Sequence, residues 1–531
     1  MILAPTDLAT FGGAMGSSLG DVQLAGAGAY AAAPSFMDAL VIGIASTAPA
    51  YSLAAVIGLV VVTVGVQSPA VLFASFVPMF FIATAFYYMN RADQDCGTTF
   101  SWVTRAMGPW AGWMGGWAIC VTGILVIGSL ADVAARYTYV LFSLDGLAAS
   151  KPAITTLAVV YMVLMTAVCV IGIELSAKVQ NVMIVAQVAT LLIFAGVALY
   201  LVFSGSSATS LSPELSWFNP FAIQDSSALI GGLLIGVFIY WGWESSVNLT
   251  EETTDSSSTP GLAAVFSTVI LLATYLSVAV AVVAFAGLGT VTEFADDDAI
   301  LSTVATGVLG SPWYLLVVLS VLTSALASTQ TTILPASRTT LSMARAGAFP
   351  RVMGNVHPRF LTPHVSTIVI GILAIIWYVP INLISENFLF DTLSALSLMI
   401  AFYYALTGFS CAIYYRKELT KSLKNFLFIG LAPVLGASLL TYLFFVSIID
   451  LSDPGASYTG GSFLGIGMPL VIGLGFLLLG AVFMVLWRVT GDGHREFFDR
   501  RPETVPPEVA AGRVKVTETA GAPADAGKKS R

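Results

Sequence analysis

The sequence predicts an all-α polytopic membrane protein with about twelve transmembrane helices. Of its 531 residues, 57% are hydrophobic and only 10% are charged, whereas a soluble protein carries about 25% charged residues. The hydrophobic residues form continuous runs of roughly 20 residues, the length that spans a hydrocarbon core of about 30 Å. The runs do not alternate with a period of two, so we expect helices and not a membrane β-barrel.

Twelve hydrophobic segments follow one another along the chain. We expect transmembrane helices near residues 38–65, 68–90, 111–142, 153–173, 179–203, 227–249, 262–289, 311–336, 364–384, 392–415, 426–450 and 463–488. Residues 1–36 precede them, are rich in glycine, alanine and serine, and contain no lysine or arginine. Because a secretory signal begins with a basic region, we interpret this stretch as a flexible N-terminal tail.

Basic residues are distributed unevenly between the two sets of loops. If both termini are cytoplasmic, the opposite loops contain only Arg136 and Lys151. The cytoplasmic set is Arg91, Arg105, Lys178, Arg338, Arg345, Arg351, Arg359, Arg416, Lys417, Lys421, Lys424, Arg488, Arg495, Arg500 and Arg501. This bias follows the positive-inside rule. The sequence therefore predicts a multi-pass protein of the cytoplasmic membrane with both termini in the cytoplasm, and residues 491–531, which are charged and rich in proline, alanine and glycine, predict a disordered cytoplasmic tail.

The first hydrophobic segment contains a proline near its middle. Pro49 donates no backbone hydrogen bond and clashes with the carbonyl of Ala45, so it breaks or kinks the helix. The residues between them are small and leave backbone groups open to a ligand, and free amides at the start of the second half-helix suit a carboxylate. The alternative is an ordinary proline kink in which small residues allow close helix packing.

The sixth hydrophobic segment contains a glycine and an acid within its apolar run. Gly242 weakens the helix there, and Glu244 follows two residues later. An ionisable group inside a membrane is a functional candidate, because it costs several kcal/mol unless it is paired or hydrated. The aromatic residues around it have an alternative interpretation as a membrane-interface belt.

Two interrupted helices at corresponding positions of two repeats are typical of secondary transporters. The interruptions at Pro49 and Gly242 lie roughly 195 residues apart, and Gly108-Pro109-Trp110 is matched by Gly310-Ser311-Pro312-Trp313 at a similar offset. We expect one membrane domain over 37–490. It would consist of inverted five-helix repeats at roughly 37–205 and 225–417, followed by extra helices at 426–488.

Three stretches carry a family resemblance. They are the small-residue break at Ser46–Pro49, the sixth helix from Phe238 to the acidic end Asn248-Leu-Thr-Glu-Glu252, and Pro335-Ala-Ser-Arg338 followed by Met343-Ala-Arg-Ala-Gly-Ala-Phe-Pro350. Together they resemble the amino acid–polyamine–organocation superfamily of permeases, over about residues 37–490. The resemblance implies a five-plus-five inverted-repeat core with discontinuous helices one and six, and a substrate bound between them.

The resemblance also implies the substrate contacts. The first break, from Ala45 through Ser46, Thr47 and Ala48, would offer backbone N–H groups to a substrate carboxylate. The carbonyls near Phe238, Ile239 and Trp241, next to Gly242, would accept from its ammonium. Phe238 would form an aromatic gate, whose ring could add cation–π attraction of about 0.5–2 kcal/mol.

One position departs from the family. Many proton-coupled members resemble one another in a lysine of the fifth helix, and this chain has Gln187 there. Two coupling routes then remain: sodium bound by the hydroxyls of Ser328 and Thr329, or a proton carried by Glu244 or Asp132. Helix packing is the alternative for the hydroxyls, and pairing with Arg136 one turn away is the alternative for Asp132.

These patterns favour a secondary active transporter of amino acids that works by alternating access, through ion-coupled symport or exchange. A polyamine or organic-cation permease, with Glu244 as counter-ion, is the alternative, followed by a transport-dead solute sensor. An enzyme is not expected, because the four cysteines are scattered singly, the three histidines lie in loops or the tail, and no nucleotide-binding loop is present. We expect no cofactor or bound metal beyond a coupling H+ or Na+, and the partners are the small-molecule substrate and the lipid bilayer, not a nucleic acid. The sequence does not predict the oligomeric state.

Overall fold

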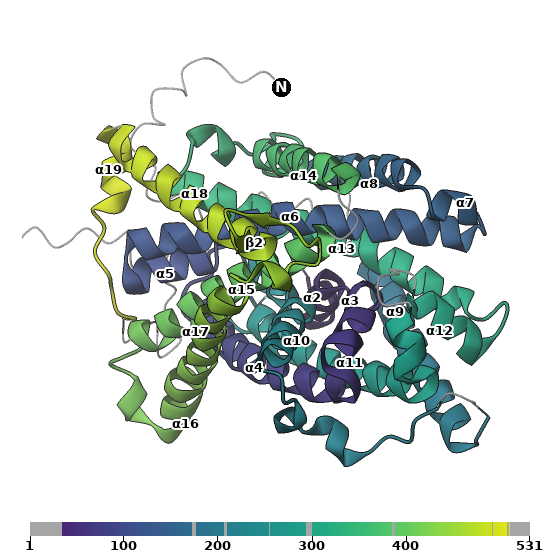
Figure 1. Ribbon diagram of the computed structural model, residues 1–531. Coiled ribbons are helices and arrows are strands. Elements are labelled where there is room, and N and C mark those ends of the chain that lie inside the picture. Colours follow the sequence, from purple (N-terminus) through teal and green to yellow (C-terminus); the bar gives the residue numbers. More distant parts are fainter. Residues whose placement is uncertain are drawn as a thin grey trace, which may run out of the picture.

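The computed structural model describes residues 34–172, 177–206, 210–253, 255–293, 300–384, 388–490, 492–506 and 509. Within them, eleven stretches are long and apolar enough to cross a membrane. The first stretch holds two crossings, because it contains a broken helix, α2 (Phe36–Thr47) and α3 (Pro49–Val64), and a second helix, α4 (Ser68–Ala92). The predicted all-α membrane fold with about twelve crossings is therefore confirmed (Figure 1).

The first half of the bundle continues with a short helix, one very long helix and two more crossings. These elements are α5 (Thr99–Met107), α6 (Pro109–Leu141), the single turn α7 (Asp145–Ala148), α8 (Lys151–Ile171) and α9 (Ala177–Phe203). Helices α4, α6 and α8 each carry a proline in their first turn. Proline is tolerated there because the amide that it lacks has no partner inside the helix.

The second half repeats this order after two short 3-10 turns, η3 (Leu215–Phe218) and η4 (Pro220–Ala222). A broken helix is again followed by a crossing, a short helix, a long helix and two crossings. The elements are α10 (Ser226–Ile239), the 3-10 helix η5 (Trp243–Glu252), α11 (Thr259–Glu293), α12 (Ile300–Leu309), α13 (Leu315–Arg345), η6 (Arg351–Gly354), α14 (His364–Ile384) and α15 (Phe388–Tyr414).

The two short helices lie at opposite ends of the bundle. Figure 1 shows α5 beside the start of α6, and α12 towards the far end, where α7 follows α6. We call these two ends the α5 end and the α7 end. Because the repeats place corresponding elements at opposite ends, the second is inverted relative to the first, as the sequence predicts.

Two further crossings complete the membrane domain. A π-helical turn, η8 (Phe426–Leu431), leads into α17 (Ala432–Asp450), and α18 (Met468–Thr490) is the last crossing. The minor elements around them are η2 (Gly65–Gln67), η7 (Leu419–Lys421), α16 (Leu423–Asn425), η9 (Pro454–Ala456) and a two-residue hairpin, β1 (Ser462–Phe463) with β2 (Ile466–Gly467).

The long helices α6 and α13 cross the centre of the molecule in close contact. Glycines on α6 permit this approach, since a Cβ added at Gly123 would lie 2.9 Å from the Cβ of Ala336 on α13. A Cβ at Gly128 would lie 2.8 Å from the Cβ of Tyr378 on α14. Small residues at such crossings allow the backbones to approach closely, which stabilises membrane helix pairs by van der Waals contact.

The chain after α18 packs against the α5 end. Helix α19 (Asp492–Phe498) places Phe497 and Phe498, which are 1% and 5% exposed, against aromatic residues of α5 and α6. Beyond it, the amide of Glu503 donates to the carbonyl of Arg105 at 2.6 Å. The prediction of disorder from residue 491 onwards is thus wrong for 492–506, where aromatic side chains supply a buried surface; residues 1–33 and 510–531 of the predicted tails lie outside the described residues.

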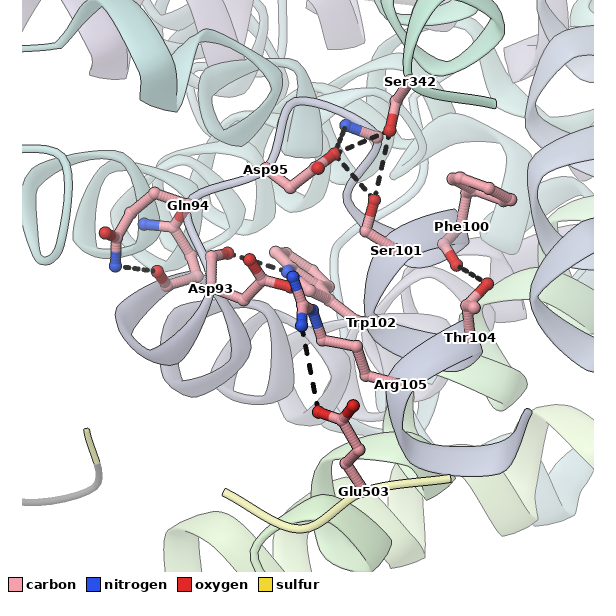
Figure 2. Close-up of polar contacts among 12 residues, drawn as sticks. Asp93, Gln94, Asp95, Phe100, Ser101, Trp102, Thr104, Arg105, Ser342 and Glu503 are labelled. Atoms are coloured by element: carbon pink, nitrogen blue, oxygen red, sulfur yellow. Dashed lines mark hydrogen bonds and ion pairs between the residues drawn. The ribbon is translucent and has the colours of Figure 1, made fainter. Parts of the chain in front are cut away.

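Figure 2 shows how charged groups fasten this segment and its surroundings. The Arg105 guanidinium contacts the carboxylate of Asp93 at 2.5 Å and that of Glu503 at 3.9 Å. Asp95 lies nearby and accepts hydrogen bonds from the hydroxyls of Ser101 at 2.7 Å and Ser342 at 2.8 Å. These contacts tie the loop after α4 to α5, to the end of α13 and to the C-terminal segment.

Candidate functional site

The first helix breaks where the sequence places Pro49. Helix α2 ends at Thr47, Ala48 adopts a left-handed conformation with φ of 51°, and α3 begins with Pro49. A left-handed alanine is strained, and such residues persist only where the surroundings hold them. The break is therefore a built feature of this helix and not a gentle proline kink.

The amides at this break differ from those we predicted. The N–H of Ala48 donates to the carbonyls of Ile44 and Ala45, so it caps α2 and is not free. The first turn of a helix leaves its amides without partners inside the helix. In α3 these are the N–H groups of Ala50 and Tyr51, since Pro49 has none and that of Ser52 donates to Ala48.

The second break lies directly opposite the first. Helix α10 ends at Ile239, and Gly242 has φ of 116° before the chain continues as η5. A Cβ at Gly242 would lie 2.8 Å from the carbonyl oxygen of Ser46, so only glycine fits. The hydroxyls of Ser46 and Ser245 join the two breaks at 2.6 Å. Two interrupted helices thus meet inside the membrane domain.

Glu244 is the acid at this junction, and its side chain is buried. Its carboxylate accepts hydrogen bonds from the hydroxyl of Tyr403 at 2.6 Å, the hydroxyl of Tyr404 at 2.5 Å and the amide of Gly242 at 3.1 Å. The indole N–H of Trp241 donates to the same Tyr403 hydroxyl. The chain of hydrogen bonds from Trp241 through Tyr403 to Glu244 links the second break to α15.

Two narrow spaces flank the junction, and Ser46 and Trp241 line both of them. In this conformation each has room for little more than a water molecule, so side chains must move when a solute binds. The first, which we call the Ser328 chamber, is lined further by Thr47, Tyr51, Ser52, Val126, Leu130, Phe238 and Ser328. The second, the Asn248 chamber, is lined further by Thr98, Ile119, Gly123, Glu244, Ser245, Asn248, Thr332, Pro335 and Ala336.

The structure brings most of the predicted substrate residues to these chambers. The residues that line them are Ser46, Thr47, Phe238, Trp241, Glu244 and the coupling candidate Ser328. Ala45, Ala48, Ile239 and Gly242 lie at the breaks without lining either chamber. The carbonyl of Ile239 accepts from the Tyr275 hydroxyl at 2.7 Å, so part of its predicted role is taken.

The predicted sodium route is only partly assembled. The Ser328 hydroxyl donates to the carbonyl of Ser46 at 2.8 Å, which places it at the first break. The Thr329 hydroxyl instead donates to Ala325 within its own helix at 2.8 Å. The amide of Gln187 donates to Thr323 of α13 at 3.0 Å, so it joins α9 to α13 and does not face either chamber.

Asp132 lies away from both chambers. It accepts hydrogen bonds from the hydroxyl of Tyr378 and from the amide of Asn382 at 3.0 Å, both on α14. The same amide donates to Thr155 of α8 at 2.9 Å. Asp132 thus sits in a buried polar cluster between α6, α8 and α14.

Four site residues were not predicted: Asn248, Thr332, Tyr403 and Tyr404. Asn248 lies in the motif that carries the family resemblance, so its position could have identified it. The tyrosines form the pair Phe402-Tyr-Tyr404 in the middle of the tenth hydrophobic segment, and mid-membrane hydroxyls of this kind require partners. That requirement indicates a polar contact, but only the fold identifies Glu244 as the group contacted.

One group of side chains at the α5 end has the spacing of a metal site. Oxygen or sulfur atoms of Asp95, Cys96 and Glu251 lie within 4.8 Å of one another. Burial raises the pKa of the Cys96 thiol well above its usual range, so the thiol stays protonated and is a poor ligand. Asp95 is already satisfied by hydroxyls, and the Arg345 guanidinium is 3.7 Å from Glu251. These contacts favour a structural role.

Ion pairs join η5 to α13 at the α5 end. The guanidinium of Arg338 lies 2.8 Å from the carboxylate of Glu252 and donates to the carbonyl of Asn248 at 3.0 Å. These contacts lie between the Asn248 chamber and the α5 end, so they close that side of the molecule.

Comparison with known proteins agrees with this arrangement. Residues 35–476 match the family model "Amino acid permease". An uncharacterized transporter of Mycobacterium tuberculosis and one of Mycobacterium bovis are 39% identical over 141 residues, which is 26% of this chain and 31% of theirs. The match therefore spans about a third of the length of these relatives.

Solved structures share the fold at low sequence identity. The structure of MhsT in complex with L-phenylalanine matches with a TM-score of 0.54 and 14% identity, over 77% of this chain and 98% of that one. A manganese transporter of Eremococcus coleocola, solved with an aromatic bis-isothiourea compound, matches with a TM-score of 0.53 and 14% identity, over 87% and 95%. The protein is a membrane transporter and not an enzyme, because the family model covers most of its length: the chain belongs to the amino acid permease family.

Proposed function

We propose that this protein is a secondary active transporter that carries an amino acid across the cytoplasmic membrane by alternating access. The observation that carries the proposal is the meeting of two interrupted helices at Ser46 and Gly242, inside a bundle with inverted repeats. Half-helix ends supply partly charged backbone groups where hydrocarbon would otherwise surround the solute. An amino acid has both the carboxylate and the ammonium that such ends recognise.

The backbone groups have distinct roles in this proposal. The amides of Ala50 and Tyr51 at the start of α3 take the substrate carboxylate, because a helix N-terminus favours an anion. Carbonyls near Phe238 and Trp241, at the end of α10, take the α-ammonium. The ring of Phe238 lines the Ser328 chamber and covers the bound substrate.

The conformational cycle follows from the closed α5 end. The distribution of basic residues supports a cytoplasmic α5 end and cytoplasmic termini. Arg338 and Glu252 then close the path to the cytoplasm, and their separation opens it. A coupling ion biases this equilibrium only through its different affinities for the two states.

Two ions are candidates for the coupling. Sodium would use the carbonyl of Ser46 and the hydroxyl of Ser328, which are already 2.8 Å apart. A proton would use Glu244, whose carboxylate lies at the junction, with Asp132 as a more distant candidate. Gln187 stands where many proton-coupled relatives resemble one another in a lysine, and it carries no proton.

Uptake into proteoliposomes tests the proposal. Purified protein is reconstituted and offered labelled amino acids under an inward proton gradient, an inward sodium gradient or neither. We expect uptake that depends on one gradient, or, for an exchanger, uptake only into preloaded vesicles. Binding of an amino acid without any uptake under all conditions would contradict transport and favour a solute sensor.

A further inference from the structure

The Asn248 chamber is lined by side-chain oxygens that accept hydrogen bonds. Asn248 is 2% exposed, and its amide nitrogen donates to the carbonyl of Cys96 at 2.9 Å, which fixes the orientation of the side chain. Among the described residues, no group donates to its Oδ1 atom. A buried acceptor without a partner costs about 1–3 kcal/mol, so it indicates a missing donor.

Thr332 presents a second oxygen without a partner. It is 3% exposed, and no described residue hydrogen-bonds its Oγ1 atom. Other threonines of α13 differ, since the hydroxyl of Thr340 donates to the carbonyl of Ala336 at 2.8 Å within the helix. The Thr332 hydroxyl is therefore free to contact a solute in the chamber.

Glu244 contributes the charge of this chamber. Three groups donate hydrogen bonds to its carboxylate, and no ion pair to it is found in the part of the chain that the structure describes. A buried carboxylate without a positive partner is strongly unfavourable. The site is thus incomplete until a cation or a proton enters it.

Trp241 forms the wall between the two chambers. Its indole is fixed by the Tyr403 hydroxyl, which in turn is fixed by Glu244. An indole face attracts an ammonium more strongly than other aromatic rings do. The same wall would accommodate the methylene chain of a substrate that reaches from one chamber to the other.

We propose that the Asn248 chamber binds a second ammonium group, carried at the end of the substrate's side chain, and that the substrates are diamino acids. Their α-amino and carboxylate groups lie at the breaks, and the distal ammonium donates to Asn248, Thr332 and the carboxylate of Glu244. This assignment rests on the proposed transport function and specifies its substrate class. A proton on Glu244 is the competing way to complete the site.

Binding of matched ligands to the purified protein tests the assignment. Lysine is compared with norleucine, which is lysine without its distal ammonium, and ornithine is compared with norvaline in the same way. We expect each diamino acid to bind at least about tenfold more tightly than its neutral counterpart, because three buried oxygens gain a donor. Equal binding within each pair would overturn the subsite, whatever the uptake measurements show.

Two variants locate the effect. Thr332→Val keeps the shape of the side chain and removes the oxygen, so the lysine preference should fall by about fivefold. Thr340→Val makes the same change on the same helix outside both chambers and should leave the preference unaltered. Glu244→Gln should abolish most of the preference, while norleucine binding stays measurable; an unchanged preference in Thr332→Val and Glu244→Gln would contradict the proposal.

The two proposals fail separately. Preference for lysine without uptake would leave the subsite intact and remove the transport function. Uptake of norleucine and lysine at equal affinity would leave transport intact and remove the subsite. A loss of all binding in Glu244→Gln that returns for lysine and norleucine alike at low pH would assign Glu244 to a proton and overturn its role as counter-ion.

Discussion

Gly242 determines how closely the two breaks approach. Its φ of 116° suits glycine, and an added Cβ would lie 2.8 Å from the Ser46 carbonyl oxygen and 3.0 Å from the Thr47 amide. We expect Gly242→Ala to separate the breaks, to lower stability by about 1–3 kcal/mol and to abolish substrate binding. Gly231→Ala on the same half-helix is the control, since its Cβ meets only Thr63 at 3.6 Å. Thermal unfolding and ligand binding measure both, and normal binding by Gly242→Ala would contradict this role.

The tyrosine pair on α15 provides a matched comparison. Tyr403 and Tyr404 each donate one hydrogen bond to Glu244, but only Tyr403 also accepts from Trp241. We therefore expect a double-mutant cycle between Tyr403→Phe and Trp241→Phe to give an interaction energy of about 0.5–1.5 kcal/mol. The cycle between Tyr404→Phe and Trp241→Phe should give a value near zero. Equal coupling in the two cycles would show that Tyr403 does not fix the indole.

Asp93 predicts a pH dependence at the α5 end. Burial raises the pKa of its carboxyl to about 6 although the Arg105 guanidinium opposes the shift. The folded protein then binds a proton that the unfolded chain, with a carboxyl pKa of about 3.9, has lost. Stability contributed by this group is present below about pH 4 and is lost as the pH rises through 6.

Asp93→Asn tests this dependence. The variant should remove that part of the fall in unfolding temperature between about pH 4 and pH 6, because an amide does not titrate. Trp102 donates to the backbone carbonyl of Asp93, so this contact survives the substitution. Asp499→Asn, at an exposed carboxylate, is the control. The same pH profile in Asp93→Asn and the unaltered protein would contradict the assignment.

At the scale of elements, local sequence predicted what local physics decides. Pro49 cannot continue a helix, and Gly242 permits a conformation that other residues avoid, so both breaks were visible along the chain. The contacts that complete the site come from elements distant in sequence. Tyr403 reaches Glu244 across 159 residues, and no periodicity within α15 predicts that partner. The cap formed by the Ala48 amide was missed because it depends on the left-handed turn of a non-glycine residue.

The C-terminal segment shows a different limit. Its composition is that of a disordered chain, yet the aromatic pair in α19 packs on α5 and α6. We expect Phe497→Ala to lower stability by about 3–5 kcal/mol, the cost of emptying a buried aromatic site. Arg501→Ala, at an exposed position four residues later, should change it little. A thermal unfolding series on the full chain measures both, and equal small effects would mean that α19 does not contribute to stability.

At the scale of the whole molecule, alternating access requires an equilibrium that contacts at the α5 end control. Arg338 and Glu252 are 11% and 28% exposed and 2.8 Å apart, whereas Arg345 and Glu251 are 50% and 33% exposed and 3.7 Å apart. Exposed pairs contribute about 0–1 kcal/mol, and partly buried pairs with further hydrogen bonds contribute more. The Arg338 pair should therefore control the equilibrium, and the Arg345 pair should not.

Charge reversal separates the two pairs. Thr332→Cys, in a background with the four native cysteines replaced, reports access to the Asn248 chamber by a thiol reagent applied from the α5 side. Arg338→Glu should raise the labelling rate by about tenfold, since about 1.4 kcal/mol changes a population by that factor. Adding Glu252→Arg should restore protection by recreating the pair in reverse, while Arg345→Glu alone should have little effect. Equal labelling in Arg338→Glu and Arg345→Glu would place the closing contact elsewhere, because a pair that does not differ between the open and closed states cannot shift their populations.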